Sequence, residues 1–258
     1  MITSQRQTEI LKAVQAHGHY SIVDLALHLN VSTETIRRQV RELVAQGLLI
    51  KFHGGVMLPT TPDELPFQRR MQFNASSKRA VAQAVAARIN DGDTLILDSG
   101  TTTAYVAEAL SAHAGLVIIT NSADIACRLA QRNGNRVFLA GGEITPEGLA
   151  AFGPGVSAFL RQFRARYALI SVGGISPRGD FGAFHLWEAE FAQTAIAQAD
   201  AAWLIADHTK FGREAPVRAG EISQLAAVVS NQPLPLPYAE YCETHGVEVY
   251  LPPQTDAE

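Results

Sequence analysis

From residue 78 onward, short apolar runs alternate with helical segments, and this alternation limits the folds that the chain can adopt. The pattern predicts strands at residues 94–97, 116–119, 137–139, 168–172, 201–205 and 225–229. It predicts helices between or beside them at 78–89, 103–110, 123–130, 156–163 and 187–199. Strands that are apolar throughout are buried on both faces, which is typical of a parallel sheet flanked by helices. We therefore predict an α/β domain with a mostly parallel sheet.

Polar and glycine residues follow five of these strands directly. The loops are Asp98–Thr103, Thr120–Ser122, Gly141–Glu143, Gly173–Gly174 and Asp207–Lys210. Ligands of open parallel sheets bind outside the carboxyl ends of the strands, so we expect these loops to converge on one crevice.

The first of these loops has the chemistry of an anion site. Gly100 permits close backbone approach, the threonines offer hydroxyl donors, and the next helix N-terminus offers free N–H groups. Lys210 adds a positive charge, while Asp98, Asn121 and Glu143 can accept hydrogen bonds from ligand hydroxyls. A phosphorylated sugar or polyol fits this chemistry. The candidate effector-binding residues are Asp98, Ser99, Gly100, Thr101, Thr102, Thr120, Asn121, Gly141, Gly142, Glu143, Gly173, Asp207 and Lys210.

Each of these features also has a purely structural explanation. The loop at Gly100 could be an ordinary strand-to-helix turn, the acidic residues could be caps, and Lys210 could be a solvated surface lysine. The sequence contains neither the dinucleotide fingerprint nor a Walker A loop, which disfavours nicotinamide cofactors and nucleoside triphosphates. The eight histidines show no metal-ligand spacing, so we predict neither a cofactor nor a metal.

The first 57 residues predict a different module, with three short helices followed by a hairpin. Ser32 is a suitable N-cap for the third helix, whose apolar stripe contains Ile36, Val40, Leu43 and Val44. Arg38 and Arg41 fall opposite this stripe and Arg37 on its flank. A short strand at 48–50 and a tight turn at Gly54-Gly55 complete a winged helix-turn-helix, whose third helix enters the major groove of DNA.

The charge distribution is consistent with a polyanionic partner for this module. Residues 1–57 contain six basic and four acidic side chains, whereas the remaining 201 contain fifteen and twenty-one. The arginines could instead simply solvate a surface helix. The candidate DNA-binding residues are Ser32, Thr33, Thr35, Arg37, Arg38, Arg41, Lys51 and His53.

Prolines mark the boundary between the two modules. Three of the eight residues from 59 to 66 are proline, so we predict domains at 1–57 and 76–258 joined by a linker at 58–75. The two cysteines give no disulfide framework, and nothing approaches eighteen consecutive apolar residues. We expect a cytoplasmic protein without a membrane partner.

Two sets of motifs together resemble the DeoR-type bacterial transcriptional regulators over nearly the whole chain. The first set is Ser32-Thr33-Glu34-Thr35-Ile36-Arg37-Arg38, Leu48-Leu49 and His53-Gly54-Gly55. The second is Asp98-Ser99-Gly100-Thr101-Thr102, Thr120-Asn121, Gly141-Gly142 and Asp207-His208-Thr209-Lys210-Phe211-Gly212. Phe211-Gly212-Arg213, Val217-Arg218 and Ile222-Ser223 are similar to the glycerol-3-phosphate-repressor branch.

The resemblance implies a homo-oligomeric repressor, dimeric or tetrameric, that binds operator double-stranded DNA and is released by a phosphorylated sugar or glycerol 3-phosphate. It also implies a sensor fold similar to sugar-phosphate isomerases. Gln39 and Ala192 depart from the family pattern, which usually has aspartate and often lysine at these positions. Two alternatives stay open: a sugar-phosphate isomerase-like enzyme with a DNA-binding head, with Glu143 or Asp98 as its base, and a sensor that acts on protein partners without DNA.

Overall fold

The computed structural model describes residues 5–17, 19–45, 48–52, 55–57, 67–131, 133–145 and 149–253. The chain folds into two compact units, residues 1–73 and 74–258. Part of the predicted linker, residues 58–66, lies outside the described residues, whereas residues 67–72 form a helix that the sequence analysis did not predict.

The first unit is a small helical domain with a three-stranded antiparallel sheet. Its helices are α1 (Gln5–His17), α2 (Ile22–His28), α3 (Thr33–Ala45) and α4 (Phe67–Gln72). Its strands, in the order β1-β3-β2, are β1 (His19–Tyr20), β2 (Ile50–Phe52) and β3 (Gly55–Met57). The strand predicted at 48–50 begins two residues later, at Ile50. Leu48 and Leu49 pair with none of the described strands; they connect α3 to β2, and their side chains pack in the core of the first unit.

Serine caps and apolar stripes explain why these helices form where they do. Ser21 Oγ accepts a hydrogen bond from the Asp24 amide at 3.0 Å, and Ser32 Oγ accepts one from the Thr35 amide at 3.2 Å. The buried side chains of α1, α2 and α3 form one core together with Leu49 and Val56. The predicted helix-turn-helix is confirmed, and β2 pairs with β3 in antiparallel fashion as a hairpin requires; of the predicted turn, Gly55 begins β3 and Gly54 lies outside the described residues.

The second unit is built on a seven-stranded sheet in the order β15-β14-β12-β9-β4-β5-β6, in which every neighbouring pair is parallel. The strands are β4 (Thr94–Leu97), β5 (Val117–Thr120), β6 (Arg136–Leu139), β9 (Ala165–Ile170), β12 (Ala199–Ile205), β14 (Ala227–Val229) and β15 (Glu248–Tyr250). The central strands are buried on both faces, as the continuous apolar runs predicted.

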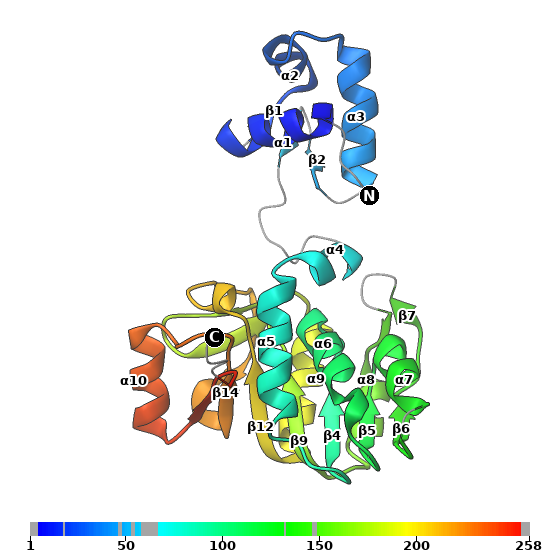
Figure 1. Ribbon diagram of the computed structural model, residues 1–258, viewed down its shortest axis with the longest axis vertical. Coiled ribbons are helices and arrows are strands. Elements are labelled where there is room, and N and C mark those ends of the chain that lie inside the picture. The colour runs from blue at the N-terminus through cyan, green and yellow to red at the C-terminus, as the bar shows by residue number, and fades with distance from the viewer. Residues whose placement is uncertain are drawn as a thin grey trace, which may run out of the picture. The chain divides into compact units, whose positions relative to one another are not determined.

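Helices cover both faces of this sheet (Figure 1). α5 (Ala75–Ala86), α6 (Thr101–Ala109) and α7 (Ala123–Ala130) pack in sequence on one side. α8 (Pro154–Leu160) packs on α9 (Leu186–Ala197), which contacts β9 and β12, and α10 (Leu236–His245) contacts β15. The predicted α/β class with a mostly parallel sheet is confirmed.

Short elements that the sequence analysis did not predict lie beside this framework. β10 (Gly174–Ile175), β11 (Asp180–Ala183) and β13 (Val217–Glu221) form a small antiparallel sheet, and β7 (Ile144–Thr145) pairs with β8 (Ala150–Ala151). Among the described residues, 3₁₀ helices also occur at η2 (Leu110–Ala112), η3 (His208–Lys210) and η4 (Ile222–Gln224). Strands of two to five residues contain too few alternations to produce a period-two signal.

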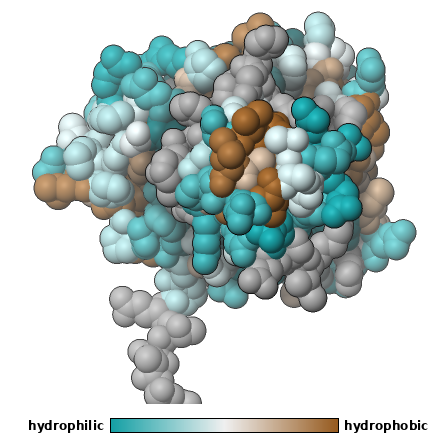
Figure 2. Space-filling view, turned by 90° about the horizontal axis from the view of Figure 1, so that it is seen from above, coloured by the Kyte–Doolittle hydropathy of each residue, from teal (hydrophilic) through white to brown (hydrophobic). Residues whose placement is uncertain are grey.

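Some apolar side chains remain at the surface. Val23 and Leu27 of α2 and Leu236 of α10 are mostly exposed, and Figure 2 shows apolar patches on an otherwise largely hydrophilic face. Within the described ranges, no helix combines the length and the apolar character required to span a membrane.

Candidate functional site

Helix α3 exposes its three arginines to solvent. Its opposite face buries Ile36, Val40 and Leu43 in the core of the first unit. Arg37 lies 3.7 Å from Glu34 in an exposed pair of the kind that contributes little to stability. In the part of the chain that the structure describes, neither Arg38 nor Arg41 forms an ion pair. Two guanidinium groups are therefore available to an external anion.

The other predicted DNA-binding residues are only partly placed. The hydroxyls of Ser32 and Thr35 lie 2.9 Å apart at the start of α3, and Ser32 also caps the helix. Thr33 is half-buried beside them. Lys51 is the middle residue of β2, while His53 lies outside the described residues.

In the second unit, the carboxyl ends of the parallel strands place the predicted loops along one edge of the sheet. β4 lies between β9 and β5, so its loop has the loops of those two strands as neighbours, and the β12 loop follows beyond β9. The chain goes from β4 to β5 on one side and from β9 to β12 on the other. The β4–β9 boundary is therefore the topological switch point, where ligands of such sheets bind.

Asp98 joins the two loops at this boundary. Its Oδ2 accepts hydrogen bonds from the amide and the hydroxyl of Ser171, at 2.6 and 2.7 Å. Its Oδ1 accepts hydrogen bonds from the Gly100 amide at 3.0 Å and from the Thr103 hydroxyl. Burial raises the pKa of Asp98, and these four hydrogen bonds oppose the rise. The acceptor capacity that we expected Asp98 to offer a ligand is thus occupied by the protein.

Gly100 lies directly against Ser171. A Cβ atom at position 100 would be 1.7 Å from Ser171 Oγ, a distance that only glycine avoids. Gly100 is the N-cap of α6, and Thr101 and Thr102 form the buried first turn of this helix. The first amides of a helix have no intrahelical acceptor, so this turn is a potential anion site held in place by Asp98 and Ser171.

The β5 loop is fastened to the small β7–β8 hairpin. Asn121 donates a side-chain hydrogen bond to the Ala151 carbonyl at 2.9 Å and accepts the Ala151 amide on its own carbonyl at 3.0 Å. Its side-chain oxygen is buried and accepts no hydrogen bond from the described residues. Thr120 Oγ1 accepts from the Ser122 amide. Gly141, Gly142 and Glu143 follow β6 and are exposed.

The β12 loop is tied to its neighbours by hydrogen bonds. Asp207 is buried and accepts from the amide and the hydroxyl of Thr209, at 3.0 and 2.5 Å. The His208 amide donates to Asn231 Oδ1 after β14, and Lys210 is half-buried at the end of η3. Further along, the Gly212 amide donates to the Ile175 carbonyl at 3.0 Å, which links this loop to the segment after β9.

Glycines allow close packing after β9. A Cβ on Gly173 would lie 2.6 Å from the Phe184 ring, and one on Gly174 would lie 2.4 Å from the Arg213 carbonyl oxygen. The loops after β4, β9 and β12 are therefore in direct contact through Ser171, Gly174 and Gly212.

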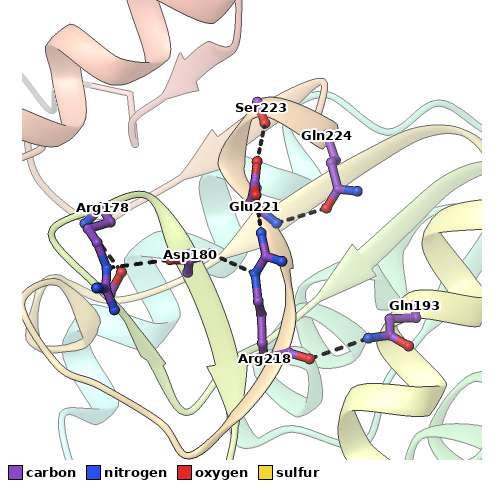
Figure 3. Close-up of polar contacts among 8 residues, drawn as sticks. Arg178, Asp180, Gln193, Arg218, Glu221, Ser223 and Gln224 are labelled. Atoms are coloured by element: carbon purple, nitrogen blue, oxygen red, sulfur yellow. Dashed lines mark hydrogen bonds and ion pairs between the residues drawn. The ribbon is translucent and has the colours of Figure 1, made fainter.

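An ion-pair network braces the small sheet beside these loops (Figure 3). The Arg218 side chain reaches between Asp180 on the neighbouring strand, at 2.6 Å, and Glu221, which is also hydrogen-bonded by Ser223. Gln193 of α9 donates to the Arg218 carbonyl at 3.3 Å. These contacts join β13 to β11, the strand that pairs with Gly174 on β10 and that ends directly before Phe184.

Comparison with known families covers both units. Residues 6–61 match the model of the DeoR-like helix-turn-helix domain, and residues 73–232 match the DeoR C terminal sensor domain. The chain belongs to the DeoR family.

Full-length relatives agree with this assignment. The glycerol-3-phosphate regulon repressor of Escherichia coli (strain K12) is 34% identical over 251 residues, which are 97% of this chain and 100% of the relative. The HTH-type transcriptional repressor CsqR of the same strain is 35% identical over 252 residues, covering 98% and 96%. The solved ribose 5-phosphate isomerase A of Methanocaldococcus jannaschii is 13% identical and covers 54% of this chain and 55% of its own, with a TM-score of 0.40.

Three residues of this DeoR-family chain that the sequence analysis did not single out have notable positions. Ser171 supplies two of the four donors to Asp98. Lys78 is 4% exposed in α5. Its spacing from Val81, Ala82 and Val85 places it on the apolar stripe of that helix, so its burial could have been predicted from the sequence. Asn74 precedes α5 with its backbone in the left-handed region, where asparagine is enriched.

Proposed function

We propose that this DeoR-family protein is a DNA-binding transcriptional repressor whose operator affinity is controlled by a small phosphorylated sugar or polyol. The observation that carries the proposal is the exposed pair Arg38 and Arg41 on α3, without ion-pair partners among the described residues. Arginine in the major groove binds guanine edges in a bidentate manner or neutralises phosphates. Arg37 and the residues at the start of α3 would add contacts, and Lys51 and His53 would touch the backbone.

The proposed effector site is the edge of the sheet around the start of α6. The free amides of the first turn would hold the phosphate, with Lys210 as the countercharge, and the unsatisfied Asn121 oxygen would accept a hydroxyl. Asp98 would position this turn through its bonds to Gly100 and Ser171, instead of binding the ligand itself. Glycerol 3-phosphate is the first compound to test, because of the name of the Escherichia coli relative.

The proposal also includes assembly as a dimer or larger homo-oligomer. Two copies related by a twofold axis would place their α3 helices about 34 Å apart, one turn of DNA, and would select a palindromic operator.

The enzyme alternative is less well supported by the site. An isomerase requires a free base near a substrate carbon, yet both oxygens of Asp98 accept protein hydrogen bonds, and Glu143 is exposed after β6.

The test begins with operator duplexes that the full-length protein enriches from a random DNA pool. Operator affinity is then measured with glycerol 3-phosphate, ribose 5-phosphate or glucosamine 6-phosphate at saturation, with glycerol and inorganic phosphate as controls. At least one phosphorylated compound should change the operator Kd roughly 5–150-fold. The proposal is wrong if no duplex is enriched, if no compound changes the affinity, or if the protein turns over either sugar phosphate.

A further inference from the structure

We propose that Asn74 is the switch residue through which the β12 loop controls the DNA-binding half of the chain, an inference that rests on the proposed function above. The boundary between the two compact units falls between Phe73 and Asn74. Asn74 is therefore the residue at which the sensor begins, and any change in its backbone angles redirects the chain that precedes it.

Asn74 has an unusual conformation for its position. It is the N-cap of α5, but its φ and ψ are 51° and 36°, in the left-handed region, whereas an N-cap residue ordinarily has an extended backbone. Its side chain makes no capping hydrogen bond to the helix. Asparagine is one of the best N-cap residues, so a favourable local interaction is left unused.

The Asn74 side chain is engaged by the β12 loop instead. Its amide nitrogen donates to Thr209 Oγ1 at 3.3 Å, and the same hydroxyl donates to Asp207 at 2.5 Å. Lys210 of this loop belongs to the proposed effector site. One turn further along α5, Lys78 is buried, so the helix itself is anchored directly after Asn74.

These contacts define two alternative states of one residue. In the observed state, Asn74 is left-handed and bonded to Thr209. In the other state it is extended, and its side-chain oxygen caps the free amides of Ser76 or Ser77 at the start of α5. An effector that displaces the Thr209 hydroxyl favours the capped state, and one that holds this hydroxyl in place favours the observed state. Residues that change φ and ψ in this way are the usual hinges of such transitions.

Two substitutions separate this switch from a merely structural role. Asn74→Asp keeps the size and the capping oxygen but removes the amide donor, so it favours the capped state. Asn74→Gly adopts both backbone conformations freely and can make neither hydrogen bond.

Asn74 also has a matched control in the sensor. Asn133 is another left-handed asparagine, with a φ of 43°, whose side-chain amide donates to the carbonyls of Ser111 and His113 at 3.0 Å each. These residues precede β5 and β6, at the end of the strands opposite to the effector loops. Asn133→Asp therefore loses the same kind of bond without touching the proposed switch.

The measured quantity is the ratio of operator Kd values with and without the phosphorylated compound, for full-length protein at saturation with each of the three compounds above. We expect this ratio to fall to about 1 in Asn74→Asp and by at least about threefold in Asn74→Gly, while Asn133→Asp keeps the wild-type ratio. Calorimetry should show that all three variants still bind the effector, with Asn133→Asp at the wild-type affinity and the two Asn74 variants shifted by no more than the wild-type coupling factor, because the effector and Asn74 act on the same two states.

The outcomes distinguish this inference from the proposed function. If the wild type responds to a compound and both Asn74 variants respond equally, the switch is refuted and the proposed function stands. If the wild type itself does not respond to any of them, the proposed function fails and the switch fails with it.

Discussion

Replacing Gly100 by alanine tests the contact between the β4 and β9 loops most directly. The backbone of Gly100 has a φ of −70° and a ψ of 157°, which alanine adopts without strain. Any cost is therefore steric, since the new Cβ would lie 1.7 Å from Ser171 Oγ and 2.7 Å from Ser171 Cβ. The loops must separate, and the Ser171 hydroxyl must leave Asp98.

The expected size of the effect follows from these two consequences. Overpacking in a close-packed site costs about 1–3 kcal/mol, and depriving a buried carboxylate of one donor costs about 1–3 kcal/mol more. We expect the free energy of unfolding to fall by about 2–6 kcal/mol in total, and the site to lose effector affinity. At a urea m value of about 2 kcal/mol/M, a loss of about 3 kcal/mol lowers the midpoint by about 1.5 M.

A second substitution makes the steric explanation refutable. In the background of Ser171→Gly, the nearest remaining atom to an alanine Cβ at position 100 is Asp98 Oδ1, at 3.3 Å. Adding Gly100→Ala to that background should lower the free energy of unfolding by less than about 1 kcal/mol. The effects of the two substitutions on the free energy of unfolding should therefore be strongly non-additive. Gly155→Ala in α8 is the control, because its Cβ would meet nothing within 4 Å.

Urea unfolding followed by tryptophan fluorescence is a suitable assay, because the chain's two tryptophans, Trp187 and Trp203, both lie in the sensor. Strictly additive costs, or a Gly100→Ala variant as stable as the wild type, would show that Ser171 does not constrain position 100.

Two further predictions concern the head and the titration of Asp98. Arg38→Ala and Arg41→Ala should each weaken operator binding, and loss of an arginine that contacts a phosphate should also reduce the slope of log K against log salt concentration by about 1. Arg161→Ala, an exposed substitution in the sensor, is the control and should change neither the affinity nor the slope. Unchanged operator binding by both α3 variants would show that α3 is not part of the interface. Because the pKa of Asp98 is raised, the folded protein keeps a proton that the unfolded chain loses, so the stability of the wild type relative to Asp98→Asn should fall as pH rises above about 4, the pKa of an aspartate in the unfolded chain. A pH-independent difference in urea-derived unfolding free energy would contradict this assignment.

The elements with strong periodicity could be predicted from the sequence, and contacts between distant loops could not. The strand at 94–97 and the helix at 123–130 were predicted at their observed bounds, because apolar runs and a serine cap are local signals. The sequence could not show that Ser171, 73 residues beyond Asp98, would saturate its carboxylate. Polar residues after strands indicate where a site lies, but the pairing among them decides which are left for a ligand.

A few hydrogen bonds are sufficient to account for regulation on this scale. A 5–150-fold change in operator affinity corresponds to a coupling free energy of about 1–3 kcal/mol. A net hydrogen bond contributes about 0.5–1.5 kcal/mol, and one to a charged group about 1.5–3 kcal/mol. The bond from Asn74 to Thr209 is of the first kind, and the bond from Ser171 to the Asp98 carboxyl is of the second. Rearranging the buried parallel strands would disrupt many such bonds at once, so we expect the effector to act on the loops and on the start of α5 while the sheet stays fixed.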